Sequence, residues 1–175
     1  MMKKKFKLLA LMVITVFSFS ILVTGCGKVA EKASEKATEK AIESASGGNA
    51  KVDLSGDKVT VKTDEGTMQV GGTNEWPSQI PADVPKFSYG KITSVMETTT
   101  NEGQSIIVSF EDVAMADLEK YKSALEGAGW KANITSKSDD GYFVSAVKDK
   151  NTISLTFGSK TDAGYSGVVG YVQGK

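Results

Sequence analysis

The chain has 175 residues, with 21 lysines balanced by 21 acidic residues, no histidine, no arginine and a single cysteine, Cys26. The lack of histidine excludes a Ser-His-Asp or Cys-His nucleophile and a histidine-ligated zinc or copper site. The lack of arginine excludes guanidinium capture of a carboxylate or phosphate, and one cysteine cannot close a disulfide within the chain, so the fold depends on its hydrophobic core.

Residues 1–25 have the organisation of a secretory signal peptide. They begin with a basic stretch, Lys3, Lys4, Lys5 and Lys7, which is expected to stay on the cytoplasmic side. Residues 8–23 form an uncharged apolar run. This run is shorter than the roughly 20 residues that a helix needs to cross a bilayer, so it is more typical of a signal peptide than of a permanent span.

A short motif follows directly, made of Leu22, Val23, Thr24, Gly25 and Cys26. It resembles the lipobox of bacterial lipoproteins. The resemblance implies cleavage before Cys26, transfer of diacylglycerol to its thiol, and acylation by a fatty acid such as palmitate. We expect a lipoprotein anchored at the outer face of the cytoplasmic membrane, because two acyl chains hold a protein stably where one does not. The alternatives are an uncleaved membrane helix, or a conventional signal peptide with a cysteine nearby by chance.

Processing would change the charge balance of the chain. Four lysines leave with residues 1–25, so 17 lysines remain against 21 acidic residues, a side-chain charge of −4. Nucleic-acid binding and docking on anionic lipid both require a surplus of positive charge. We therefore expect contact with membrane lipid only through Cys26, and no nucleic-acid partner.

Residues 26–48 combine the cysteine with a repeat of alanine, glutamate and lysine. Residues 29–45 are strong helix formers, and Ala30, Ala33, Ala37 and Ala41 recur at helical spacing. This alanine stripe is too thin to bury much surface, so the pattern predicts a solvated helical spacer. A weakly self-associating helix is the alternative.

Residues 49–72 and 73–87 differ sharply in composition. In the first range, pairs of apolar residues alternate with polar ones between glycine-containing turns, which predicts a small antiparallel meander that leans on the main domain. The second range holds all three prolines and predicts an extended connector. We expect Trp76, Ile80 and Val84 to pack this connector against the sheet.

Residues 88–175 are expected to form an α+β domain. Alternating runs predict strands, and a 3.6-residue stripe that includes Leu118, Tyr121 and Leu125 predicts a helix over 115–126. The order ββαββββ indicates a twisted antiparallel sheet with the helix packed on one face. The strands are predicted at 92–98, 104–110, 130–136, 142–148, 152–158 and 167–173.

Two motifs suggest a relationship. One is the segment 80–85, Ile-Pro-Ala-Asp-Val-Pro, and the other is the spacing of Tyr121, Leu125, Gly129 and Trp130. Together they are similar to small extracytoplasmic lipoprotein domains of unknown function, in which such a helix end packs on an antiparallel sheet. The resemblance covers roughly residues 50–173 and implies an envelope location but no activity.

Few side chains stand out as candidate site residues. Trp76 is the candidate binding residue, either as one wall of a groove for a glycan or peptide or as cover for a sheet edge. Trp130 is expected in the core. The acids Glu111, Asp112 and Asp117 are expected to cap the helix and complement its dipole. Asp139 and Asp140 are expected to form a turn, and no metal or catalytic residue is predicted.

The sequence therefore favours a non-catalytic, membrane-anchored module that binds an envelope protein, a peptide or a wall polymer, without a cofactor. Exposed sheet edges would offer strand addition as a binding mode. Two alternatives remain open. One is a carboxylate-dependent enzyme acting on cell-wall glycan, which needs a pair of facing acids. The other is a carrier of a small ligand or cation, which needs a deep pocket.

Overall fold

The computed structural model describes residues 28–54 and 57–174. The predicted signal peptide, the lipobox and Cys26 lie outside the described residues. By its internal contacts the chain divides into two compact units, residues 1–37 and 38–175. The described elements are α2 (Lys28–Ala45), β1 (Ala50–Asp53), β2 (Lys58–Thr63), β3 (Gly66–Gly71), β4 (Lys91–Thr100), β5 (Gly103–Val113), α3 (Met115–Gly127), β6 (Lys131–Ser138), β7 (Gly141–Lys148), β8 (Asn151–Thr161) and β9 (Gly164–Gln173).

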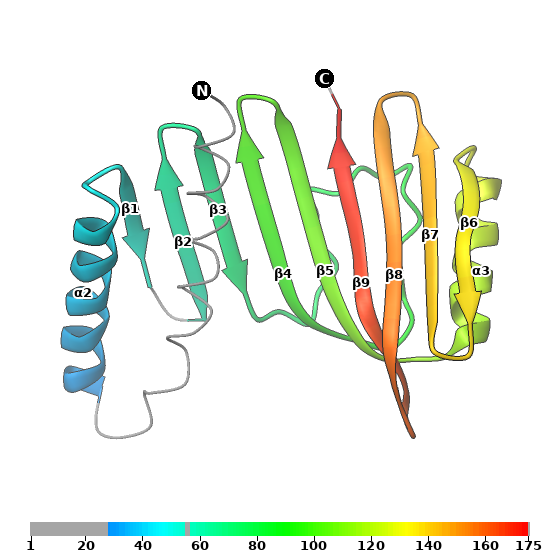
Figure 1. Cartoon of the computed structure of the whole chain (residues 1–175), viewed down its shortest axis with the longest axis horizontal. Coiled ribbons are helices and arrows are strands. Elements are labelled where there is room, and N and C mark those ends of the chain that lie inside the picture. The colour runs from blue at the N-terminus through cyan, green and yellow to red at the C-terminus, as the bar shows by residue number, and fades with distance from the viewer. Residues whose placement is uncertain (1–27, 55–56, 175) are drawn as a thin grey trace. The chain divides into compact units, whose positions relative to one another are not determined.

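All of these strands belong to one antiparallel sheet, in the order β1-β2-β3-β4-β5-β9-β8-β7-β6 (Figure 1). The expected α+β class with an antiparallel sheet is confirmed. The expected order ββαββββ does not describe the complete sheet, because a helix and three further strands come before it. The meander extends this sheet instead of leaning on it, since β3 pairs with β4 from Gly66↔Thr100 to Gly71↔Val95.

Helix α3 joins β5 to β6 and packs on β6 and β7. Its buried side chains are Leu118, Tyr121 and Leu125, as its periodicity predicts. The expected capping by acidic side chains is wrong: the N-cap is Ala114, and no side chain bonds to the free amides there. Only Asp117 lies in the first helical turn, where it complements the helix dipole.

Helix α2 is not a fully solvated spacer. Within the unit 38–175, the Glu43 carboxylate accepts a hydrogen bond from the Val52 amide at 3.1 Å, and the Glu39 carboxylate accepts one from Leu54 at 2.9 Å. The last turns of α2 therefore protect β1, which is an edge strand whose amides would otherwise be open to another chain. Neither described helix has the length and hydrophobicity of a membrane span.

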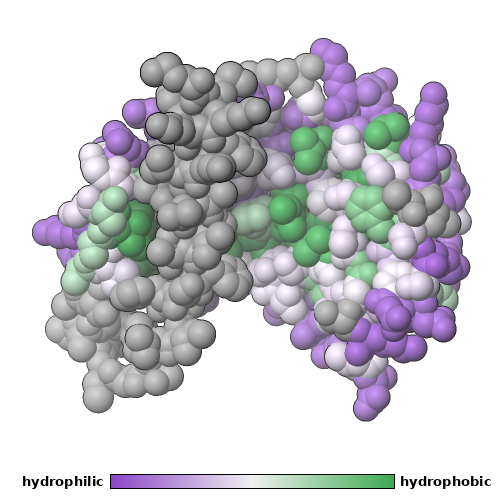
Figure 2. Space-filling view, viewed as in Figure 1, coloured by the Kyte–Doolittle hydropathy of each residue, from purple (hydrophilic) through white to green (hydrophobic). Residues whose placement is uncertain are grey.

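The sheet has two contrasting faces, which follow from the strand register. The face towards α3 carries the hydrophobic core, formed by α3, the connector and alternate residues of β5, β9, β8 and β7. We call the opposite one the open face. Figure 2 looks onto the open face: in the part to the right of the grey atoms, apolar (green) and weakly polar (white) residues lie inside a margin of strongly hydrophilic ones (purple).

Candidate functional site: an aromatic groove beside the connector

The connector between β3 and β4 folds against the face of the sheet that carries α3. Two backbone hydrogen bonds, from Ile80 to Pro77 and from Val84 to Pro81, form turns at the prolines. Ile80 and Val84 are buried, and Trp76 is partly buried against the core. The predicted packing of these three residues is confirmed.

Three side chains hold the connector in place. The Tyr121 hydroxyl donates to the Pro85 carbonyl at 2.8 Å, and the Trp130 indole donates to the Asp83 carbonyl at 3.2 Å. Lys148 donates to the Asp83 carboxylate at 2.9 Å. Because these donors come from α3, β7 and the residue just before β6, the connector is tied to the elements that form the core.

Phe87 forms the centre of an aromatic cluster where the connector ends. Its ring is 1 % exposed and lies 4.6 Å from Phe110, 4.8 Å from Tyr121 and 5.3 Å from Tyr89. All three contacts are edge-to-face, the geometry that the ring quadrupoles favour. Trp76 lies 6.4 Å from Phe110 and extends the cluster towards the surface.

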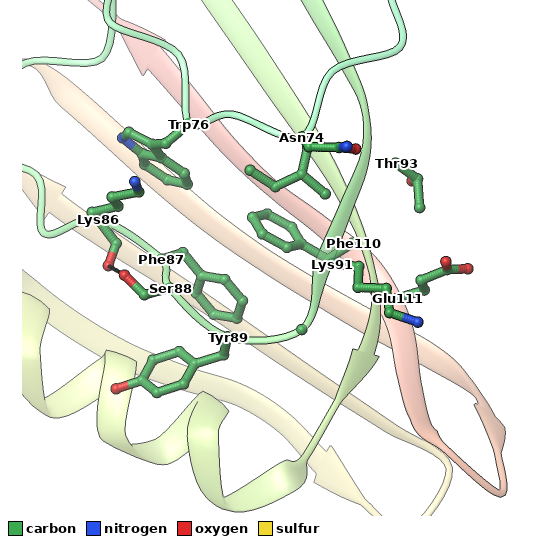
Figure 3. Close-up of a pocket in the computed structure, with 12 residues that line it drawn as sticks. Asn74, Trp76, Lys86, Phe87, Ser88, Tyr89, Lys91, Thr93, Phe110 and Glu111 are labelled. Atoms are coloured by element: carbon green, nitrogen blue, oxygen red, sulfur yellow. Dashed lines mark hydrogen bonds between the residues drawn. The ribbon is translucent and has the colours of Figure 1, made fainter.

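A groove of about 680 Å³ opens over this cluster. The Phe87 and Phe110 rings form its floor, and Trp76 and Tyr89, both partly buried, lie beside them (Figure 3). The figure also shows Thr93 and Glu111 extending away from the rings. The groove is lined by Asn74, Trp76, Lys86, Phe87, Ser88, Tyr89, Gly90, Lys91, Ile92, Thr93, Phe110 and Glu111.

The lysines around the groove differ in whether they have an ion-pair partner. Lys91 forms a 2.6 Å ion pair with Asp112, and the hydrogen bond in this pair raises the pKa of Lys91. Lys120 lies 6.0 Å from the centre of the Tyr89 ring, within reach of a cation–π contact. Lys86 is exposed and forms no ion pair within the part of the chain that the structure describes. The groove therefore offers an unpaired cation beside aromatic rings.

The predicted site residues do not all come together. Trp76 lines the groove, whereas Trp130 is 2 % exposed and belongs to the core, as expected. Glu111 lies at the groove, but Asp117 pairs with Lys120 on α3.

The two aspartates of the predicted turn lie elsewhere. Asp139 and Asp140 occupy the turn between β6 and β7, and the Asp139 carbonyl accepts a hydrogen bond from Tyr165. Among the described residues, no group of three or more histidine, cysteine, aspartate or glutamate side chains is placed to hold a metal.

Sequence reasoning missed most of the groove. Tyr89 is one of four tyrosines that the sequence offers for an aromatic face, but Lys86 and Phe87 lie between the prolines and the first predicted strand, outside any predicted element, and carry no predicted role. A signal was present in the alternation of Phe87 and Tyr89 around Ser88. This period of two is typical of an extended segment with one buried side.

The arrangement is suited to binding. Aromatic faces pack against slightly positive C–H groups, and an indole N–H or a lysine can bond to a polar group beside them. Among the described residues, the Trp76 indole nitrogen has no hydrogen-bond partner, and Figure 3 shows it at the outer end of the ring, away from Phe87 and Phe110.

Comparisons with protein-family models, with curated proteins and with solved structures find no match for this chain.

Proposed function

We propose that this protein is a membrane-anchored extracytoplasmic lipoprotein whose aromatic groove binds a saccharide segment of an envelope polymer. The observation that carries the proposal is the position of Trp76, partly buried against Phe110 at the rim of a groove of about 680 Å³. The signal peptide and lipobox motif support the envelope location.

A saccharide fits the chemistry of this groove. The apolar faces of sugar rings stack on aromatic side chains such as Trp76 and Tyr89, while their hydroxyl and acetamide groups bond to nearby donors. Lys86 would add attraction for a sugar that carries a carboxylate or phosphate, because an ammonium group attracts either anion. A peptide is the second kind of ligand that the residues suggest.

In the proposed architecture, the ββαββββ segment, residues 88–175, is the binding domain. The first part of α2, before Thr38, would serve as the spacer from the acylated Cys26. At 1.5 Å per residue, a helical spacer of about ten residues spans about 15 Å.

The other candidate functions receive less support. Hydrolysis of a glycosidic bond by the usual mechanism uses two carboxylates that flank the bond. The groove lining includes one carboxylate, Glu111, which extends away from the rings. A carrier of a small ligand typically encloses it almost completely, whereas this groove lies open at the surface (Figure 3).

A co-sedimentation experiment tests the proposal. Full-length protein, extracted from membranes in mild detergent, is mixed with insoluble wall polymer purified from the cells that produce it. We expect binding, and we expect Trp76→Ala to weaken it about tenfold or more, the loss typical of truncating an aromatic side chain that anchors a ligand. Lys86→Ala should weaken binding less and in a salt-dependent way.

Matched variants complete the design. Lys58→Ala removes an exposed lysine from β2, outside the groove lining, and should leave binding unchanged. Thermal unfolding of each variant checks that the fold is intact. Equal binding by the wild type and Trp76→Ala, or no binding by either, would overturn the proposal.

A further inference from the structure

The two ends of the aromatic groove carry different charges. In Figure 3, Lys86 and Trp76 lie on one side of the two phenylalanine rings that form the floor. Lys91 and Glu111 lie on the other side. We call these two sides the Lys86 end and the Lys91 end. A ligand that lies along the groove therefore meets a different set of charges at each end.

Carboxylates outnumber the cation at the Lys91 end. Lys91 is paired with Asp112 at 2.6 Å, so its charge is already compensated. Glu111 is exposed and adds a second carboxylate, which forms no ion pair within the described part of the chain. An anionic group of a ligand would be repelled at this end.

The Lys86 end offers hydrogen-bond donors that are free. The Lys86 ammonium can donate three hydrogen bonds, and the Trp76 indole can donate one. Among the described residues, neither group has a hydrogen-bond or ion-pair partner. Glu75, the acid beside Trp76 in the chain, is exposed and lies outside the groove lining. An anionic group of a ligand would therefore find two free donors at this end.

We propose that the groove selects an anionic saccharide, whose carboxylate or phosphate bonds to Lys86 and Trp76 at the Lys86 end. This inference rests on the proposed function and adds to it the class of sugar and its direction in the groove. Aromatic rings stack on neutral and anionic sugars alike, whereas a cation distinguishes the two. Lys86 is therefore the residue that determines specificity.

The groove is larger than a simple anion requires. Its volume of about 680 Å³ lies within the range of about 300–1,000 Å³ that is typical of sites for organic ligands. A free phosphate or carboxylate ion would occupy the Lys86 end and leave the aromatic rings uncovered. A sugar that carries such a group covers the rings and reaches Lys86 at the same time.

Binding to native wall polymer gives the first test. Full-length protein in mild detergent is mixed at low ionic strength with insoluble wall polymer from the cells that produce it. We expect Lys86→Gln to weaken binding about fivefold, the upper range for an exposed ion pair. The difference from the wild type should vanish near 1 M salt, where the Debye length is about 3 Å. Lys86 is exposed, so the substitution should not disturb the fold.

The matched control replaces a lysine away from the groove. Lys58→Gln removes the same charge from β2, outside the groove lining, and should leave binding unchanged. Residues 26–175 carry a side-chain charge of −4, so the chain as a whole does not attract an anionic polymer and the attraction has to be local. Equal losses from Lys86→Gln and Lys58→Gln would overturn the proposal.

Chemical treatment of the polymer provides the second test. One portion is treated with hydrofluoric acid to remove phosphate, and in another portion the carboxyl groups are reduced to alcohols. We expect one treatment to weaken wild-type binding about fivefold and to make the wild type and Lys86→Gln bind equally. The two losses should not add, because the cation and the anion belong to one interaction. The effective treatment identifies the anion as phosphate or carboxylate.

Two further variants test the direction of the ligand. Trp76→Phe keeps an aromatic ring but removes the N–H donor, so it should weaken binding of the native polymer more than binding of the polymer without its anion. Glu111→Gln removes the carboxylate at the Lys91 end and should leave binding unchanged or tighten it up to about twofold. Weaker binding by Glu111→Gln would overturn the proposed direction.

The outcomes separate this inference from the proposed function. If Trp76→Ala weakens binding while Lys86→Gln binds as well as the wild type, the groove binds a saccharide without regard to charge and only this inference fails. It also fails alone if both treated polymers leave the loss caused by Lys86→Gln unchanged. If the wild type does not bind the native polymer, or if Trp76→Ala binds it equally well, both fail. Thermal unfolding checks that each variant is folded.

Discussion

The two faces of the sheet are built from the same strands but differ in what stabilises them. The face towards α3 buries large aromatic and aliphatic side chains and is covered by α3 and the connector. The open face pairs small polar residues with valine, methionine and isoleucine. Because side chains alternate along each strand, one face supplies the hydrophobic core and the groove, while the other carries mostly small side chains, both polar and apolar.

The largest effect should come from truncating matched phenylalanines on the two faces. Phe87→Ala removes the ring at the centre of the aromatic cluster and should lower the free energy of unfolding by about 3–5 kcal/mol. Phe143→Ala, on the open face and partly exposed, should lower it by about 1 kcal/mol. Urea unfolding measures both values. Equal losses would contradict the assignment of stability to the face that carries α3.

Alkaline pH should lower the free energy of unfolding through Tyr142, whose side chain is buried on the face towards α3. Burial raises the pKa of Tyr142 to about 12, with a further contribution from the nearby Glu119 charge. Because the folded pKa lies above the unfolded value of 10.0, the stabilisation is complete below pH 10 and is lost as the pH rises towards 12, by at most about 1.4 kcal/mol per pH unit.

The matched variant for this pH dependence is Tyr142→Phe. Lysines titrate in the same range, so the relevant quantity is the difference in free energy of unfolding between wild type and variant from pH 9 to 12. That difference should shrink or reverse as the pH rises. A constant difference would show that the Tyr142 hydroxyl is not desolvated in the folded state.

Two tyrosine hydroxyls should respond in opposite ways. Tyr121→Phe leaves the Pro85 carbonyl without its donor and should cost about 1 kcal/mol. The Tyr171 hydroxyl is buried and makes no hydrogen bond to the described part of the chain, so Tyr171→Phe should be neutral or stabilise slightly. Thermal unfolding compares the pair, and a larger loss for Tyr171→Phe would mean that its hydroxyl has a partner.

The smallest effect concerns the β1 edge. Glu39→Ala and Glu43→Ala should each cost about 0.5 kcal/mol, because the freed amides regain bonds to water. Hydrogen exchange is the sharper measurement, and it should accelerate at Leu54 in the first variant and at Val52 in the second. Lys40→Ala, an exposed change on the same helix, is the control and should not alter exchange at either amide.

Some of this architecture was predictable from local pattern. The spacing of Leu118, Tyr121 and Leu125 predicts α3 and its buried side, and the glycine-containing turns at 101–103 and 139–141 predict two hairpins. These features depend on residues close together in the chain, whose periodicity is visible in the sequence.

The long-range features were not predictable in the same way. The pairing of β3 with β4 spans the whole connector, and nothing in residues 72–90 specifies which strand lies beside β3. The role of Glu39 and Glu43 at the β1 edge was also hidden, because the repeat of α2 makes all of its glutamates look alike. Trp76 was a candidate from the sequence, whereas its convergence with Tyr89, Phe87 and Phe110 required the fold.

The central claim is that the groove binds a wall polymer. Its most direct test is oxidative footprinting of the two tryptophans on intact cells, before and after the wall is digested. Trp76 should be protected while the polymer is present and become oxidised several times faster after digestion. Trp130, buried in the core, should react slowly in both states. Equal oxidation of Trp76 with and without the wall would contradict the claim.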